Sequence, residues 1–199
     1  MPFPFPNSLT CLSPWLKDDA GGTPALPVME DRRIVIVGFM GCGKTTVARA
    51  LAQRLGCEMI DLDSFITERE GRTPAEIIEA DGEPAFREIE THALRDALKM
   101  DDARVIALGG GAWTIEANRA LVAQHDCLSV WLDAPFELCW ERITSSGDTR
   151  PLAPDRESAY RLYKSRCENY QLADARISVD QADSMGVLAA MVLTSIISD

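Results

Sequence analysis

The sequence lacks the patterns that are typical of membrane-spanning, zinc-binding and disulfide-stabilised proteins. No apolar run reaches the length of about 18 residues that a membrane-spanning helix needs. The six cysteines form no Cys-x-x-Cys pair, and the two histidines are far from them in sequence, which argues against a zinc site or a redox motif. The formal net charge of −11 disfavours a nucleic-acid or anionic-membrane surface. We therefore expect reduced thiols and a cytoplasmic protein.

The length and composition are those of an ordinary globular domain. The chain has 199 residues, of which 46% are hydrophobic and 26% charged, so one domain with a sizeable core is expected. No spare apolar face is apparent, which favours a monomer. Most basic residues are arginine, the better partner for a carboxylate or phosphate, although a high-GC genome would produce the same bias.

The first 28 residues differ in kind from the rest. They read "MPFPFPNSLTCLSPWLKDDAGGTPALPV", are rich in proline and show no helical or strand period. They also lack the basic start and apolar centre of a signal peptide. We expect residues 1–28 to be a disordered extension. Met29 would make a sensible start codon, so this segment is either dispensable or a misassigned start, and a single domain is expected over residues 30–199.

From residue 30 onward, short Val- and Ile-rich runs alternate with amphipathic stretches. The expected strands are 33–38, 58–62, 104–108, 127–133 and 176–180. The expected helices are 44–55, 63–70, 74–80, 83–100, 115–125, 135–143, 157–171 and 184–197. This alternation predicts an α/β fold with a parallel sheet covered on both faces. Such sheets bind ligands at the carboxyl ends of their strands.

A phosphate-binding loop follows the first expected strand. The stretch "GFMGCGKT", residues 38–45, matches G-x-x-x-x-G-K-[ST] and lies between an apolar strand and a helix. Backbone N–H groups and the positive helix end would hold phosphate oxygens. Lys44 would reach the β- and γ-phosphates, and the Thr45 hydroxyl would bind Mg²⁺. A plain strand-to-helix turn is the alternative. The guanine-reading signature N-K-x-D is absent from the sequence.

Cys42 is the unusual residue of this loop. A helix N-terminus and Lys44 would both favour its thiolate, which suggests inactivation by oxidation. The simpler interpretation is that a small side chain fits at this position.

Two carboxylates close the second expected strand in "MIDLDSF". Asp61 and Asp63 are two residues apart, so on a strand both side chains would point to one face. Such a pair could serve a metal ion and an acceptor hydroxyl together. Alternatively, Asp63 could act only as the N-cap of the next helix.

An arginine follows in "DGEPAFREIETHAL". Arg87 and Glu90 are three residues apart and would share a helical face. They could form a surface ion pair that contributes little. An arginine held by Glu90 could instead be directed at a carboxylate.

These motifs, taken in order, resemble the shikimate kinase family over residues 30–199. The resemblance rests on "GFMGCGKTT", "DLD" at 61–63, "GEPAFREIE", "LGGGA" at 108–112, "RPL" at 150–152 and "RCENYQLAD" at 166–174. It implies transfer of the ATP γ-phosphate to the 3-hydroxyl of shikimate, in the route to aromatic amino acids. It also implies a fold of the nucleoside monophosphate kinase type, a three-layer sandwich whose five-stranded parallel sheet is flanked by helices and covered by a lid.

The resemblance assigns residues to the nucleotide and the metal. The nucleotide-binding set is Gly41, Cys42, Gly43, Lys44, Thr45, Thr46, Arg142 and Arg150. Arg142 would lie against the adenine, and Arg150 would reach the transferring phosphate from the lid, which corresponds to the irregular segment 144–158. One Mg²⁺ would be held by Thr45 and, through water, by Asp61.

A second set is assigned to shikimate. It consists of Asp63, Arg87, Gly109, Gly110, Gly111 and Arg166. Asp63 would orient the attacking hydroxyl and take its proton, with Lys44 and Arg150 as the other catalytic residues. Arg87 and Arg166 would clamp the carboxylate. The glycine triplet after "VIAL", the expected central strand, would let the backbone approach the acceptor closely, although a tight turn alone is the alternative.

Some features leave the function open or depart from the family. The family pattern "RPLL" is "RPLA" here, so Ala153 removes an apolar contact that could help the lid to close. A gluconate or nucleotide kinase, a kinase acting on quinate or a similar acid, and a nucleotide-binding regulatory module are the rival functions. His92 and His125 are expected to be structural or surface residues, the tryptophans 131 and 140 are expected in the core, and Trp113 is expected near the crevice.

Overall fold

The computed structural model describes residues 32–146, 151–180, 183 and 185–197. The predicted extension 1–28 and Arg150 therefore lie outside the described residues. Over the described part of the chain, no helix has both the length and the apolar character needed to cross a membrane.

The five expected strands form one parallel sheet. They are β1 (Ile34–Val37), β2 (Glu58–Asp61), β3 (Ala103–Ala107), β4 (Leu128–Asp133) and β5 (Ala175–Ser178), in the order β2-β3-β1-β4-β5. The α/β class is confirmed. The central strand is β1 rather than the strand before the glycine triplet, since β3 lies between β1 and β2.

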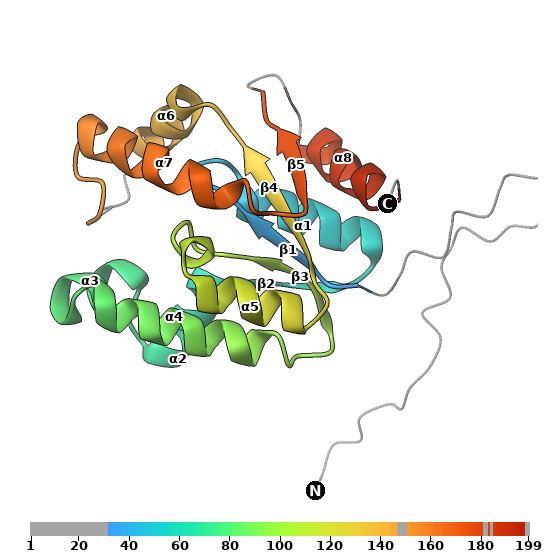
Figure 1. Ribbon diagram of the computed structural model, residues 1–199, viewed down its shortest axis with the longest axis horizontal. Coiled ribbons are helices and arrows are strands. Elements are labelled where there is room, and N and C mark those ends of the chain that lie inside the picture. Colours follow the sequence, from blue (N-terminus) through green and yellow to red (C-terminus); the bar gives the residue numbers. More distant parts are fainter. Residues whose placement is uncertain (1–31, 147–150, 181–182, 184, 198–199) are drawn as a thin grey trace, which may run out of the picture.

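Helices cover both faces of the sheet (Figure 1). They are α1 (Lys44–Leu55), α2 (Leu62–Glu70), α3 (Pro74–Asp81), α4 (Glu83–Ala97), α5 (Glu116–Gln124), α6 (Phe136–Ser146), α7 (Arg156–Tyr170) and α8 (Met185–Ile197). Helices α1 and α8 pack against each other on one face, while α4 and α5 lie on the other (Figure 1). The result is the expected three-layer sandwich.

Burial explains why the strands carry so little polar alternation. All four residues of β1 are buried, and β4 is buried up to its last residue, as expected for strands covered on both sides. The side chains of Leu51, Leu94 and Leu188, from α1, α4 and α8, are fully buried in the same core. This core fixes the carboxyl ends of the strands.

Helices extend into both ends of the segment that the sequence predicts to be irregular. Residues 144–146 continue α6 and residues 156–158 begin α7, so the prediction of a loop over 144–158 is wrong at both ends. Asp155 caps α7 by accepting a hydrogen bond from the Ser158 backbone N–H at 2.7 Å. Ala153 is buried with Phe136 and Ala159, so this position still contributes an apolar contact despite its small side chain.

Sheet order determines where the predicted motifs meet. The phosphate loop leaves β1, the glycine triplet follows β3, and Asp61 ends β2. These three strands are neighbours and parallel, so their carboxyl ends open onto the same side of the sheet.

Candidate functional site

A cavity of about 370 Å³ lies at the carboxyl ends of these strands. Every predicted site residue that the structure describes lines it, except Cys42. The predicted residues that line it are Gly41, Gly43, Lys44, Thr45, Thr46, Asp61, Asp63, Arg87, Gly109, Gly110, Gly111, Arg142 and Arg166. Apolar residues of α3 and α4 also contribute, namely Pro74, Ala75, Ile78 and Phe86, and none of them was predicted as a site residue.

The phosphate loop has the backbone of an anion cradle. Gly38, Gly41 and Gly43 have φ values of 144°, 77° and 101°, which side-chain-bearing residues rarely adopt. The last of them is the N-cap of α1, and no side chain caps this helix. The Lys44 ammonium donates to the carbonyls of Gly38 and Phe39 at 3.0 and 2.9 Å, so it lies over the loop. Helix N–H groups and one cation therefore face the cavity together.

Cys42 turns away from this cradle. Its side chain is fully buried, and a β-carbon at Gly38 would lie 2.9 Å from its sulfur. The geometry favours the interpretation that a small side chain fits here over the hypothesis of oxidative inactivation, because an oxidant would first have to reach a buried thiol. Arg142 donates to the carbonyls of Gly41 and Cys42, at 3.3 Å in each case, and thereby flanks the loop.

Asp61 combines two tasks at the end of β2. Its Oδ1 accepts a hydrogen bond from the Ser64 backbone N–H at 3.1 Å and caps α2. Its Oδ2 accepts from the Thr45 hydroxyl at 2.5 Å. The capping role considered for Asp63 thus belongs to Asp61. A hydroxyl and a carboxylate next to a phosphate loop are the hard oxygen ligands that Mg²⁺ prefers, so these residues fit the ion.

Asp63 reaches the cavity by a different route from the one predicted. It lies in the first turn of α2 and not on a strand, so the argument that both aspartates share one strand face is wrong. Its carboxylate nevertheless lines the cavity. The Oδ1 of Asp63 and the Oε1 of Glu90 lie 2.7 and 2.6 Å from the point where a β-carbon at Gly109 would be. Only glycine leaves room for both carboxylates at this position.

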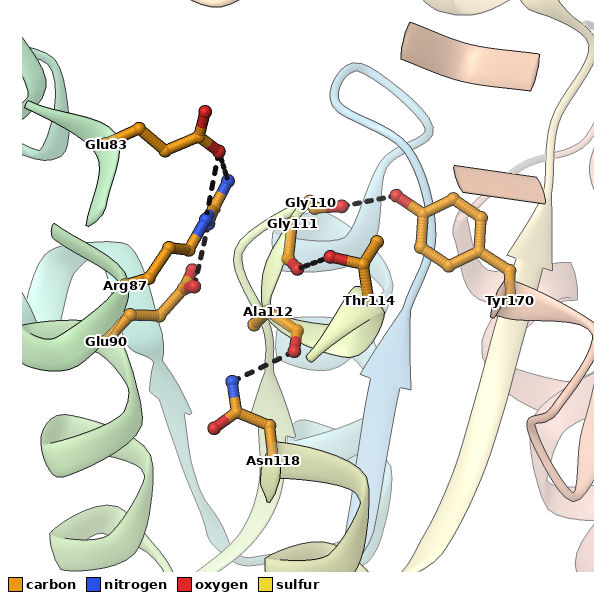
Figure 2. A network of polar contacts seen from close by, with 9 residues as sticks. All are labelled: Glu83, Arg87, Glu90, Gly110, Gly111, Ala112, Thr114, Asn118 and Tyr170. Atoms are coloured by element: carbon orange, nitrogen blue, oxygen red, sulfur yellow. Dashed lines mark hydrogen bonds and ion pairs between the residues drawn. The ribbon is translucent and has the colours of Figure 1, made fainter. Parts of the chain in front are cut away.

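Arg87 is held by two carboxylates of its own helix (Figure 2). Its guanidinium donates to Glu83 Oε1 at 2.7 and 3.1 Å and to Glu90 Oε2 at 2.7 Å. The Glu90 side chain is 1% exposed and that of Arg87 18% exposed, so this is not the surface ion pair considered from the sequence. Burial alone would lower the pKa of Arg87, but Glu90 and Glu83 outweigh it and raise this pKa. The guanidinium therefore stays charged at the cavity wall.

Glu90 is a strongly perturbed carboxyl group of the site. Burial raises its pKa to about 7 against the opposing charge of Arg87, and the charge of Asp63 raises it further. Its Oε1 is buried without a hydrogen-bond partner among the described residues. Ionisation of a carboxyl group in this buried position costs desolvation free energy, and the charges of Arg87 and Arg166 offset only part of that cost.

Arg166 provides a second guanidinium from α7. It is 5% exposed, and burial lowers its pKa, with the charge of Arg87 acting in the same direction. A β-carbon at Gly110 would lie 3.4 Å from its Nη1, and one at Gly111 would lie 2.6 Å from Arg87 Cζ. The glycine triplet therefore separates two arginines, which is the arrangement that a bound carboxylate would require.

Three side chains to which the sequence analysis assigned no role hold the glycine turn (Figure 2). The Tyr170 hydroxyl donates to the Gly110 carbonyl. The Thr114 hydroxyl donates to the Gly111 carbonyl at 2.7 Å, and the Asn118 amide donates to the Ala112 carbonyl at 2.9 Å. Thr114 ends the short 3₁₀ helix η1 (Ala112–Thr114) that follows the turn. A tight turn without a site role is disfavoured, since the turn lies within the cavity wall.

The histidines and tryptophans that the sequence analysis singled out do not line the cavity. Trp131 and Trp113 are buried in the core, and Trp140 is half-buried and stacked on Phe136 at 6.3 Å between ring centroids. Trp113 follows the glycine turn by two residues, and its own side chain belongs to the core and not to the cavity wall. The side chains of His92 and His125 are exposed.

Comparison with known proteins gives a consistent result. The family model for shikimate kinase matches residues 40–197. A shikimate kinase of Ruegeria pomeroyi is 37% identical over 88% of this chain and 88% of its own. One of Geobacter sulfurreducens is 41% identical over 78% of this chain and 87% of its own. A solved structure of an Acinetobacter baumannii shikimate kinase in complex with shikimate is 36% identical, covers 84% of this chain and 93% of its own, and superposes with a TM-score of 0.78.

The buried Glu90 predicts a specific dependence of stability on pH. Its pKa is about 7 in the folded protein and 4.5 in the reference state, so the folded protein holds the proton more tightly. Its contribution to stability is complete below pH 4.5 and is lost as the pH rises through about 7. We expect the melting temperature of the wild type to fall between pH 5 and pH 8 relative to that of Glu90→Gln.

Differential scanning calorimetry across this range measures the effect. Glu88→Gln, an exposed position of the same helix, is the control and should follow the wild type. Parallel pH profiles for the wild type and Glu90→Gln would show that Glu90 keeps an ordinary pKa.

Proposed function

The chain belongs to the shikimate kinase family, and we propose that its cavity transfers the γ-phosphate of ATP to the 3-hydroxyl of shikimate. The enzyme is an ATP-dependent phosphotransferase of the shikimate pathway. One observation carries the assignment of the site. A single cavity is lined by the phosphate loop, by the carboxylate of Asp63 and by two guanidinium groups separated by a glycine turn.

The nucleotide would lie along the phosphate loop. The N–H groups at the start of α1 would receive the phosphates, and Lys44 would move from the loop carbonyls to the β- and γ-phosphates. Arg142, next to Gly41, would lie against the adenine. The assignment of Arg150 to the transferring phosphate and the lid remains a prediction outside the described residues.

The acceptor would occupy the end of the cavity that Arg87 and Arg166 flank. Two guanidinium groups bind a carboxylate with charge-assisted hydrogen bonds and fix the orientation of the ring that carries it. Glu83 and Glu90 keep Arg87 in place for this purpose. The Asp63 carboxylate would then accept a hydrogen bond from the 3-hydroxyl and take its proton as the phosphoryl group transfers. Most of the catalysis in such transfers comes from positioning and charge neutralisation.

A divalent metal would accompany the nucleotide. Thr45 and Asp61 supply the oxygens that fit Mg²⁺, and the ion would neutralise phosphate charge when bound. The described cysteines are free, which supports a cytoplasmic setting. We infer a monomer, since shikimate, ATP and the metal all find their residues within one chain.

The acceptor is tested by measuring ADP release with a panel of compounds. We expect turnover with shikimate and at least about 100-fold lower kcat/KM with nucleoside monophosphates, which have no carboxylate for Arg87 and Arg166. We expect a similar reduction with gluconate, which has a carboxylate but is an open chain and does not hold a hydroxyl at a fixed place beside Asp63. The ratio of kcat/KM for shikimate to that for quinate, a close analogue, measures how strongly the site discriminates between similar ring acids. Turnover on gluconate or a nucleotide without turnover on shikimate would refute the proposal, and ATP binding without any turnover would favour a regulatory module.

Asp61→Asn separates metal binding from helix capping. Asparagine is as good an N-cap as aspartate, so the melting temperature should stay close to that of the wild type. Loss of the charge should raise the Mg²⁺ concentration for half-maximal activity by roughly tenfold. Titration of activity with Mg²⁺ at saturating ATP and shikimate measures this, with Asp61→Ala as the variant that loses both functions. An unchanged Mg²⁺ requirement in Asp61→Asn would exclude Asp61 from the metal site.

Alanine substitutions along the glycine triplet should have graded and different effects. At Gly111 the new β-carbon would overlap Arg87, so KM for shikimate should rise by about tenfold or more with KM for ATP nearly unchanged. At Gly109 it would displace Asp63, so kcat should fall most. At Gly110 the nearest atoms are 3.3 and 3.4 Å away, and the rise in KM for shikimate should be smaller than at Gly111. Effects confined to KM for ATP would assign the triplet to the phosphate side.

A further inference from the structure

Tyr170 connects the core of the protein to the glycine turn. It is the last residue of α7, and its side chain is 1% exposed. Its ring lies 6.1 Å from that of Trp131 in β4, measured between centroids, so the ring is held by the sheet. Its hydroxyl donates to the carbonyl of Gly110, 60 residues away in the sequence. Burial raises the pKa of Tyr170 despite the neighbouring charge of Arg166, so the hydroxyl remains a donor.

The hydrogen bond acts on a peptide unit that has unusual freedom. The Gly110 carbonyl and the Gly111 N–H belong to one planar trans peptide and point in opposite directions. Glycine on both sides of that unit allows it to rotate more freely than any peptide flanked by side chains. A donor fixed in the core therefore determines the direction of the Gly111 N–H as well as that of the carbonyl.

The opposite side of the turn faces Arg87 (Figure 2). Tyr170 and Arg87 lie on either side of the glycines in this view, and a β-carbon at Gly111 would overlap the Arg87 guanidinium. A rotation of the Gly110–Gly111 peptide would move backbone atoms that lie next to the Arg87 guanidinium, and would therefore change the room available to it. Arg166, one turn before Tyr170 on α7, approaches the turn from the same helix.

We propose that Tyr170 is a positioning residue for the acceptor: its hydrogen bond to Gly110 orients the Gly110–Gly111 peptide between Arg87 and Arg166. The inference rests on the proposed function, because it concerns the part of the cavity assigned to shikimate. It predicts a defect in acceptor binding without a matching defect in nucleotide binding.

Tyr163 offers a matched control on the same helix. Its hydroxyl also donates to a backbone carbonyl, that of Ala134, at 3.0 Å. Its ring contacts Phe39 with centroids 5.2 Å apart, and Tyr163→Phe keeps that ring. The two Tyr→Phe variants therefore lose the same chemical group, and only one of them loses it at the glycine turn.

Steady-state kinetics of Tyr170→Phe, Tyr163→Phe and the wild type test the proposal. We expect Tyr170→Phe to raise KM for shikimate by about fivefold to tenfold, the usual consequence of one lost hydrogen bond to a buried acceptor, with KM for ATP within about twofold. Tyr163→Phe should leave KM for shikimate unchanged. Equal changes in both KM values, or an unchanged KM for shikimate in Tyr170→Phe, would overturn the role of Tyr170.

Two further measurements keep the test independent of folding and of the acceptor assignment. Replacement of Tyr170 by 4-aminophenylalanine restores an N–H donor on the ring and should return KM for shikimate towards the wild-type value. A persistent defect would show that the hydroxyl does not act as a donor. Wild-type turnover on shikimate is recorded first, since its absence refutes the proposed function. If another acid acceptor is used, the same comparison with that acceptor decides on Tyr170.

Discussion

The site depends on keeping carboxylates and guanidinium groups together in the cavity wall, where Glu90 and Arg166 are buried. Glu90 is fully buried, yet it lies beside Arg87, Arg166 and Asp63. Burying any one of these charges alone would cost on the order of several kcal/mol of desolvation free energy, and the attraction between opposite charges in the cluster offsets much of that cost. The compensation is incomplete, because the pKa of Glu90 remains raised. Arg166 has the opposite need, because burial and the charge of Arg87 lower its pKa, and a bound carboxylate would stabilise this buried cation.

Much of the fold was predictable because parallel strands buried on both faces leave a clear pattern. The runs "RIVIVG" and "RVIAL" contain almost no polar residue; the first ends in a glycine and the second is followed by one. The phosphate loop was equally clear, since its glycines are required by positive φ values that other residues avoid. The ends of α4 and α6 were less predictable. No proline or glycine marks the stop of α4 at Ala97, and α6 continues through three small polar residues to Ser146.

The site was predictable at the positions that carry charge and much less so at those that hold the charges in place. The spacing of Arg87 and Glu90 indicated a pair on one helical face, but not its burial, which follows from the packing of α4. The roles of Asp61 and Asp63 were partly confused, because α2 begins one residue earlier than expected and Asp61 becomes its cap. Tyr170 gave no sign of its contact with Gly110, since that contact joins positions 60 residues apart.

The acidic character of the whole chain gives these local arrangements their importance. With a net charge of −11, the average field around the protein repels both ATP and a carboxylated acceptor. Binding must therefore come from short-range contacts, where a guanidinium at hydrogen-bonding distance outweighs distant charges that salt screens. This places strict demands on the geometry of Arg87 and Arg166. Glu83 and Glu90 hold the Arg87 guanidinium in place, and Gly111 leaves the space that this guanidinium needs. The sequence motifs predicted the arginine and the glycine, but not that two buried or half-buried carboxylates would fix the arginine.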